Sequence, residues 1–196
     1  HWLKVYQVPE SGPASKGKAI VNLLQLQPNE KVATTVAVKE FRNDVSLVFA
    51  TERGTVKKTE LSAFGNPRAG GIIAINIDEG DRLLAVRVAE PGHDILLGTA
   101  KGQSIRFPES DLRPLGRATR GVRGISLSGV GRVVVLVVAP PPLVRGRLRV
   151  ALRRVLPLLL APERRDVEVG PVAAQRLVAA AVGEVRAEDP PVVVAV

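Results

Sequence analysis

Two stretches of the chain repeat each other: Phe49-Ala50-Thr51-Glu52-Arg53-Gly54-Thr55-Val56-Lys57-Lys58 and Leu97-Gly98-Thr99-Ala100-Lys101-Gly102-Gln103-Ser104-Ile105-Arg106. They lie 48 positions apart, so Thr51 aligns with Thr99, Arg53 with Lys101, Gly54 with Gly102 and Lys58 with Arg106. A fixed period of about 20–50 residues is typical of repeat architectures. Because the repeat keeps its basic positions, it also indicates a repeated surface for a polyanion.

Each repeated stretch has the pattern of two strands joined by a tight turn. In Glu52-Arg53-Gly54 and in Ala100-Lys101-Gly102, the glycine comes last. Glycine adopts positive φ at little cost, and a tight hairpin needs such a residue. The basic residue before it is then expected in solvent, so we predict Arg53 and Lys101 at hairpin tips.

The rest of the first 139 residues continues this all-β pattern. Short segments rich in Val, Ile, Leu and Thr alternate with turn residues, and prolines recur too often for long helices. The predicted strands are 19–26, 31–38, 45–51, 55–59, 72–77, 82–88, 95–99 and 103–107.

The repeat extends beyond the two hairpins on a looser register. Gly71–Ile77 resembles Gly17–Leu23 and, more weakly, Gly121–Leu127. We therefore divide residues 1–139 into the end of one unit, complete units at about 29–77 and 80–127, and the start of another at Gly131–Val137. Units of about 50 residues with about four strands each are typical of propeller blades.

Composition limits the classes of function. The 196 residues carry a net charge of +9 and a pI of about 10.6, which fits a nucleic acid or another acidic partner, although a basic protein without such a partner fits equally. There is no cysteine and only two histidines, so disulfides and thiolate metal sites are excluded and an imidazole metal site is disfavoured. No signal peptide and no apolar run of about 18 residues is found, which predicts no membrane partner. The absence of methionine predicts that the chain begins inside a longer protein.

Residues 140–196 differ in composition from the part before them. They contain no Lys, Ile, Asn, Ser, Thr, Phe, Tyr, Trp or His. One interpretation is a low-complexity tail that is disordered. A second is a small helical region, because Val144–Leu160 and Val172–Val182 are compatible with helices. The third is translation of a GC-rich gene in a wrong reading frame, and the composition favours it, since the residue types present have GC-rich codons.

Four stretches carry a family resemblance: Leu3-Lys4-Val5-Tyr6-Gln7-Val8-Pro9-Glu10, Lys18-Ala19-Ile20-Val21-Asn22-Leu23-Leu24, Arg53-Gly54-Thr55-Val56-Lys57-Lys58-Thr59 and Gly121-Val122-Arg123-Gly124-Ile125. They resemble the C-terminal domain of the A subunit of bacterial DNA gyrase. The resemblance covers about residues 1–139. The A subunit of topoisomerase IV has a related domain and is the alternative, but the first two stretches are more similar to gyrase.

The resemblance implies a β-pinwheel, a ring of four-stranded blades with duplex DNA wrapped around a basic rim, of which this chain holds part. It implies a parent type II topoisomerase that introduces negative supercoils, built from a dimer of gyrase A subunits with gyrase B subunits in the bacterial cytoplasm at the nucleoid. ATP and Mg²⁺ are used elsewhere in that complex, so no cofactor is expected here. The family's catalytic tyrosine lies in a region that this chain does not contain, so Tyr6 is not its counterpart. The family's basic, glycine-rich box would precede His1, and the family has six blades.

We predict twelve basic residues as phosphate contacts of the rim, with no sequence reading and no catalytic or metal-binding role. They are Lys16, Lys18, Arg53, Lys57, Lys58, Arg68, Lys101, Arg106, Arg113, Arg117, Arg120 and Arg123. Each phosphate contact releases condensed counterions, so affinity should fall steeply with salt. The competing interpretation is that these are ordinary solvated residues of strands and turns. Lys57 is the weaker candidate of its pair, because its repeat partner Ile105 is apolar.

Three other functions remain open on the sequence. A propeller that binds protein through its loops predicts no DNA binding. A hydrolase built on a propeller would need convergent acids or histidines, and the chain has few; the acidic turn Asp78–Asp81 is better explained by solvation than by a metal ion. An incomplete array with unpaired edges could also have no activity by itself.

Overall fold

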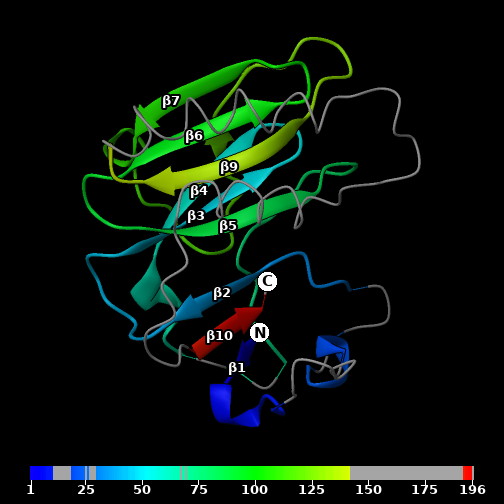
Figure 1. Ribbon diagram of the computed structural model, residues 1–196, viewed down its shortest axis with the longest axis vertical. Coiled ribbons are helices and arrows are strands. Elements are labelled where there is room, and N and C mark those ends of the chain that lie inside the picture. The colour runs from blue at the N-terminus through cyan, green and yellow to red at the C-terminus, as the bar shows by residue number, and fades with distance from the viewer. Residues whose placement is uncertain are drawn as a thin grey trace.

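The computed structural model describes residues 1–10, 19–24, 26, 30–66, 68, 70–141 and 192–195. Within them the chain forms ten β-strands in three antiparallel sheets, together with four short 3-10 helices. The sheets follow one another along the long axis of the molecule (Figure 1). The expected all-β class is therefore confirmed.

The central sheet has four strands, and the first and third sheets have three each. The central sheet has the order β5 (Leu83–Ala89), β3 (Ser46–Thr51), β4 (Thr55–Glu60) and β8 (Val122–Arg123). The third sheet has the order β9 (Val133–Ala139), β6 (Asp94–Thr99) and β7 (Ser104–Pro108). The first sheet has the order β2 (Thr35–Val38), β10 (Val192–Ala195) and β1 (Trp2–Leu3). The 3-10 helices are η1 (Val5–Gln7), η2 (Ile20–Asn22), η3 (Leu61–Phe64) and η4 (Glu109–Asp111).

The central and third sheets each combine strands from consecutive sequence units instead of coinciding with one unit. The hairpin β3–β4 of one unit pairs with β5 and with β8, which open and close the next unit. The hairpin β6–β7 likewise pairs with β9, the opening strand of the unit after that. Equivalent strands of successive units therefore take equivalent positions in these two sheets, and each of the two sheets is shared between neighbouring units.

The two predicted hairpins form as expected. Gly54 and Gly102 have φ of 87° and 79°, the positive values that the tight turns require. The turns also match in detail, because the N–H of Thr55 donates to the hydroxyl of Thr51 and that of Gln103 to the hydroxyl of Thr99, both at 3.1 Å. The alignment of these threonines in the sequence therefore reflects one repeated turn.

Three of the predicted strands differ from the structure. Residues 19–26 contain η2 in their described part, and of 31–38 only Thr35–Val38 forms a strand. Residues 72–77 form no strand; Ile72, Ala74 and Ile75 pack instead against the core between the first and central sheets. Their apolar character therefore reflects packing onto that core rather than strand pairing.

The core lies in two layers on the two faces of the central sheet. Val48 and Ala50 belong to the layer shared with the third sheet, and Leu47 and Phe49 to the layer shared with the first sheet. Because neighbouring residues of a strand point to opposite faces, β3 is buried on both faces and forms a continuous apolar run.

The interpretations of residues 140–196 fall mostly outside the described residues, including Val144–Leu160 and Val172–Val182. The exception is β10, a strand that the sequence reasoning missed. It pairs antiparallel with both β1 and β2, and so takes the position that β3 and β6 hold in the other two sheets.

Candidate nucleic-acid interface

The two hairpin-tip residues are exposed as predicted, and each also contacts the next unit. Arg53 Nη1 donates a hydrogen bond to the carbonyl of Glu79 at 3.1 Å, and its backbone N–H donates to Asp81 Oδ1 at 3.0 Å. Lys101 Nζ donates to the carbonyl of Ser128 at 2.7 Å. The repeated basic residue therefore fastens the hairpin of one unit to a turn of the next, which explains why the repeat keeps it.

Lys57 does not lie on an exposed rim, where it was predicted. Its exposed fraction is 0%, and Nζ donates hydrogen bonds to the carbonyl of Ala74 at 2.6 Å and to that of Arg117. Nζ also lies 5.6 Å from the ring centroid of Phe49, its cross-strand neighbour. Burial lowers the pKa of Lys57 to about 8, because an ammonium loses its hydration there. A phosphate cannot reach this side chain in the described arrangement.

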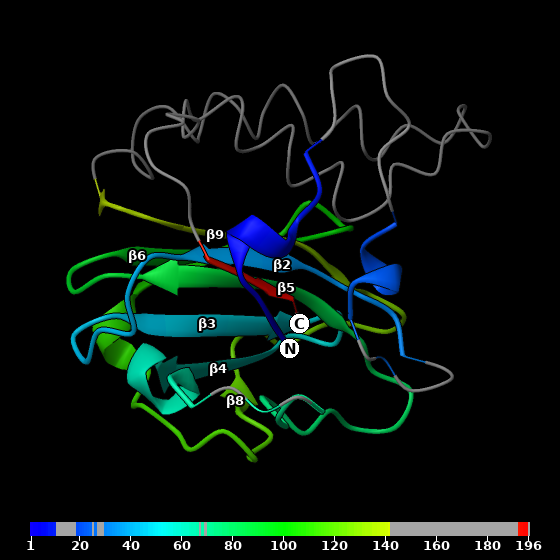
Figure 2. The same ribbon diagram turned by 90° about the horizontal axis from the view of Figure 1, so that it is seen from below.

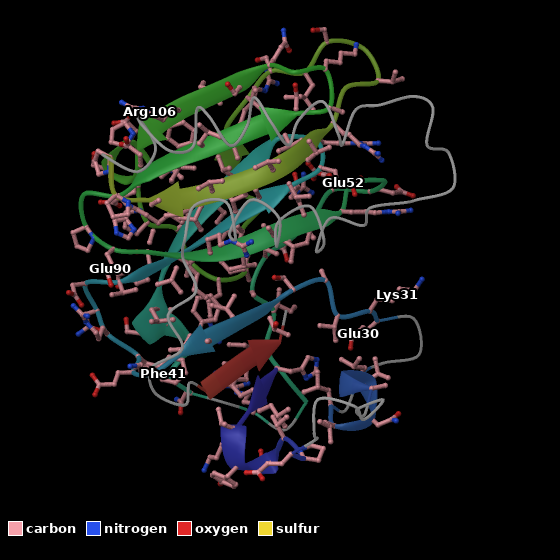
Figure 3. The ribbon with its side chains drawn as sticks, viewed as in Figure 1. Glu30, Lys31, Phe41, Glu52, Glu90 and Arg106 are labelled. Carbon is pink, nitrogen blue, oxygen red and sulfur yellow. The ribbon has the colours of Figure 1, made fainter. Side chains whose placement is uncertain are left out.

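Lys58 is also buried, on the opposite face of β4. It is 7% exposed, and its Nζ forms an ion pair of 2.6 Å with Glu109 Oε2 and donates to the Glu109 carbonyl at 2.9 Å. Its repeat partner Arg106 lies on the outer strand of the third sheet, with Nη1 3.2 Å from Asp94 Oδ2 and a side chain that is 34% exposed (Figure 3). Of this predicted pair, only Arg106 presents its guanidinium to solvent.

The remaining candidates gather in the cationic segment, Arg113–Arg123, which has four arginines and no acidic residue. The segment follows η4 and the buried Leu112, and it joins β4 where Leu115 N–H donates to the Lys58 carbonyl at 2.8 Å. It ends in β8, which pairs with the outer side of β4 and forms the edge of the central sheet (Figure 2). Hydrogen bonds to the sheet therefore anchor the segment along that edge.

The arginines of the cationic segment are largely accessible. Arg113, Arg120 and Arg123 are exposed, and Arg117 is half-buried. Arg120 Nη1 lies 3.1 Å from Asp78 Oδ1, in a surface pair whose side chains are 74% and 55% exposed. Such a pair contributes little to stability, so Arg120 can exchange Asp78 for another anion at small cost.

Arg68, a further predicted contact, is exposed in the loop after η3. Lys16 and Lys18 lie outside the described residues. Asp81 of the acidic turn Asp78–Asp81 forms hydrogen bonds within the protein, because its Oδ1 also accepts from the Arg82 N–H at 2.7 Å. Among the described residues there is no cluster of three metal-ligating side chains, and none of their helices is long and apolar enough to cross a membrane.

The sequence reasoning missed the inter-unit role of the basic residues. One signal was available for Lys57, because its counterpart Ile105 is apolar and not basic. No comparable signal marked Glu109 as the partner of Lys58.

Comparison with known proteins gives consistent results. The family model described as DNA gyrase C-terminal domain, beta-propeller, matches residues 2–39, 46–90 and 93–140. The DNA gyrase A subunit of Klebsiella oxytoca is 45% identical over 138 residues, which cover 70% of this chain and 16% of that protein. The corresponding protein of Clostridium acetobutylicum is 49% identical over 122 residues, covering 62% of this chain and 15% of that protein. The chain thus spans about one sixth of the length of these relatives.

Solved structures show the same fold. A DNA gyrase A C-terminal domain matches with a TM-score of 0.57 at 23% identity, covering 63% of this chain and 41% of that one. The C-terminal domain of DNA topoisomerase IV also matches with a TM-score of 0.57, at 25% identity over 62% of this chain and 38% of that one. Together with its paired hairpins and shared sheets, the family match over most of its length shows that this chain belongs to the DNA gyrase C-terminal domain family of β-propellers.

Proposed function

We propose that this chain binds duplex DNA without sequence preference, through the cationic segment at the edge of the central sheet. The observation that carries the proposal is a segment with three exposed arginines, a half-buried fourth and no acid, anchored along a sheet edge in a chain of the gyrase C-terminal domain family. Arg68 and Arg106 are exposed as well and are secondary candidates. Lys57 and Lys58 are not included, because their ammonium groups are buried and bonded within the protein.

The mechanism is electrostatic capture followed by bending. Arginine guanidinium groups on phosphates release counterions and fix the path of the duplex without reading its bases. Bending a few tens of base pairs costs about 1–6 kcal/mol, which several such contacts must offset. Anchoring of the segment's backbone to the sheet suits this role, since less backbone entropy is lost when the segment binds.

The wider role is proposed by analogy with the relatives named as DNA gyrase A subunits. In this proposed role, the chain contributes DNA wrapping to a dimer of gyrase A subunits that is assembled with gyrase B subunits in the bacterial cytoplasm. The complex introduces negative supercoils. ATP and Mg²⁺ act outside this chain in that proposal. The chain itself contributes binding and bending.

The experiment is a titration of a long linear duplex with the full chain at several salt concentrations. Each lost phosphate contact should reduce the slope of log K against log salt by about 0.9. We expect Arg113→Gln/Arg123→Gln to reduce the slope by about 2 and to weaken binding to all sequences equally.

The matched control is Arg82→Gln/Arg132→Gln. It removes the same charge from two exposed arginines that precede β5 and β9, which are the edge strands opposite β8 and β7 in their sheets. This control should keep the slope. Equal slopes for the two double variants would assign binding to net charge and reject the cationic segment as the interface, and binding that ignores salt would reject electrostatic capture.

A further inference from the structure

Three consecutive carbonyl groups of the cationic segment accept hydrogen bonds from residues outside it. The ammonium of Lys57 donates to the Arg117 carbonyl. The side-chain amide of Asn76 donates to the Ala118 carbonyl at 3.1 Å, and its backbone N–H donates to the Thr119 carbonyl at 3.0 Å. We call Lys57 and Asn76 the clamp, because together they hold the turn at residues 117–119.

The clamp also joins the cationic segment to the loop at residues 72–78. Lys57 Nζ donates a second hydrogen bond to the Ala74 carbonyl at 2.6 Å, so one ammonium bridges the loop and the segment. Asn76 belongs to the same loop, and two residues further on Asp78 forms its surface pair with Arg120. The loop is therefore connected to the segment at three neighbouring positions.

Packing alone does not explain a lysine at position 57. The repeat counterpart of Lys57 is Ile105, which is apolar. Burial lowers the pKa of Lys57 to about 8, so the folded chain bears a desolvation cost that an apolar residue would avoid. The lysine offsets this cost by donating to two carbonyl groups, one of which belongs to the cationic segment.

The clamped turn carries two of the four arginines of the segment. Arg117 and Arg120 lie on either side of Ala118 and Thr119, whose carbonyls accept from Asn76. A turn that becomes ordered only on binding weakens the binding constant by about 5- to 30-fold for each residue that must be fixed. Hydrogen bonds that already fix the turn in the free protein remove this penalty.

We propose that Lys57 and Asn76 are positioning residues for DNA binding, which hold residues 117–120 in the conformation that presents Arg117 and Arg120 to the phosphates of a duplex. This inference rests on the proposed function, because it assumes that the cationic segment contacts DNA. Neither clamp residue contacts a phosphate itself. Loss of the clamp therefore lowers affinity without removing a phosphate contact.

The first test compares Asn76→Ala with Asn43→Ala in the titration of a long linear duplex at several salt concentrations. Both asparagines are exposed, and Asn43 lies in the turn before β3. Asn76→Ala should weaken binding by about three- to tenfold and keep the slope of log K against log salt, because every arginine is still present. Asn43→Ala should bind as the unchanged chain does.

The second test asks whether Asn76 acts through the two arginines. In a chain that carries Arg117→Gln and Arg120→Gln, Asn76→Ala should leave affinity unchanged, because no guanidinium remains in the turn to be positioned. A general loss of structure would weaken binding by the same factor in both backgrounds.

The third test uses the pH dependence of binding to examine Lys57. Between pH 7 and pH 9 the Lys57 ammonium loses its charge, and its hydrogen bond to the Arg117 carbonyl weakens. Relative to Lys57→Met, the unchanged chain should lose about threefold or more in affinity over this range. The charged groups beside the clamp, Arg117, Arg120 and Asp78, are present in both proteins, so their effects cancel in the comparison.

The direction of this change separates positioning from stability. Burial penalises the charged lysine, so the unchanged chain becomes more stable from pH 7 to pH 9, and an affinity that followed stability would rise. Asn76 is exposed, so Asn76→Ala tests the clamp without disturbing the core, even where Lys57→Met folds poorly.

The results that would overturn the proposal differ from those that reject the proposed function. Equal affinities of Asn76→Ala and Asn43→Ala would overturn the clamp, and the proposed function would stand if Arg113→Gln/Arg123→Gln still reduced the slope. A loss of affinity that persists without Arg117 and Arg120 would also overturn it. Binding of the unchanged chain that ignores salt would reject both the clamp and the proposed function.

Discussion

Replacing Lys57 with methionine should make the stability of the protein less dependent on pH. The folded pKa of Lys57 is lowered by burial to about 8 from its ordinary 10.5. Between these two values the unfolded chain holds a proton that the folded chain has released, so the free energy of unfolding rises with pH in this window. Below about pH 8 the folded state must bury the charged form and the full cost is present.

The magnitude follows from the size of the pKa shift. Each pKa unit is worth about 1.4 kcal/mol, so the whole window from 8 to 10.5 is worth at most about 3.5 kcal/mol. Methionine keeps a long apolar side chain against Phe49 but leaves the carbonyls of Ala74 and Arg117 without their donor. Each unpaired carbonyl costs about 1–3 kcal/mol at every pH, which shifts the variant uniformly without changing its slope.

The assay is urea unfolding of the chain and of Lys57→Met at pH 7, 8, 9 and 10, followed by the fluorescence of Trp2, the single tryptophan. The difference in unfolding free energy between the two proteins cancels the other titrating groups. We expect it to move in favour of the unchanged chain by about 2–3 kcal/mol from pH 7 to pH 10. The change should persist in 0.5 M salt, because desolvation is not screened as surface charges are.

A difference that stays constant over this range would refute the reasoning, since it would mean that Lys57 titrates alike in both states. A difference that moves in the opposite direction would mean that the carbonyl partners outweigh the loss of hydration and raise the pKa.

Two further substitutions test how neighbouring units are joined. Gly121→Ala should destabilise the fold by about 2–4 kcal/mol, because a Cβ there lies 2.5 Å from the Val56 carbonyl oxygen and the residue has a φ of 104°. The control Gly116→Ala, where the nearest contact of a Cβ is 4.0 Å away, should change the free energy of unfolding by no more than about 0.5 kcal/mol. Equal thermal unfolding midpoints for these two variants would contradict the close approach at Gly121. Glu109→Gln should cost about 2–4 kcal/mol, because it leaves the Lys58 ammonium buried without a counter-charge, whereas Glu60→Gln at an exposed site should change little. Similar urea midpoints for these two variants would show that the Lys58–Glu109 ion pair does not join the units.

The hairpins were predictable from the sequence, because a glycine with positive φ between two β-rich runs has few alternatives. The burial of Lys57 and Lys58 was not, since their cover comes from Arg117 and Glu109, 60 and 51 residues away along the chain. Residues 72–77 show the same limit, because a strand and a segment packed on a core have similar composition. The run of arginines in the cationic segment is visible in the sequence itself, and its predicted role in DNA binding stays a prediction.

The sharing of sheets between units has a consequence for synthesis on the ribosome. Lys57 bonds to a carbonyl 60 residues further along the chain, so the hairpin β3–β4 leaves the ribosome well before the segment that covers it. At about 5–20 residues per second, the delay is on the order of 3–12 seconds. Throughout that time a lysine destined for the interior stays hydrated and the edge of β4 stays open. Completion of the central sheet is therefore timed by translation of the unit that follows it.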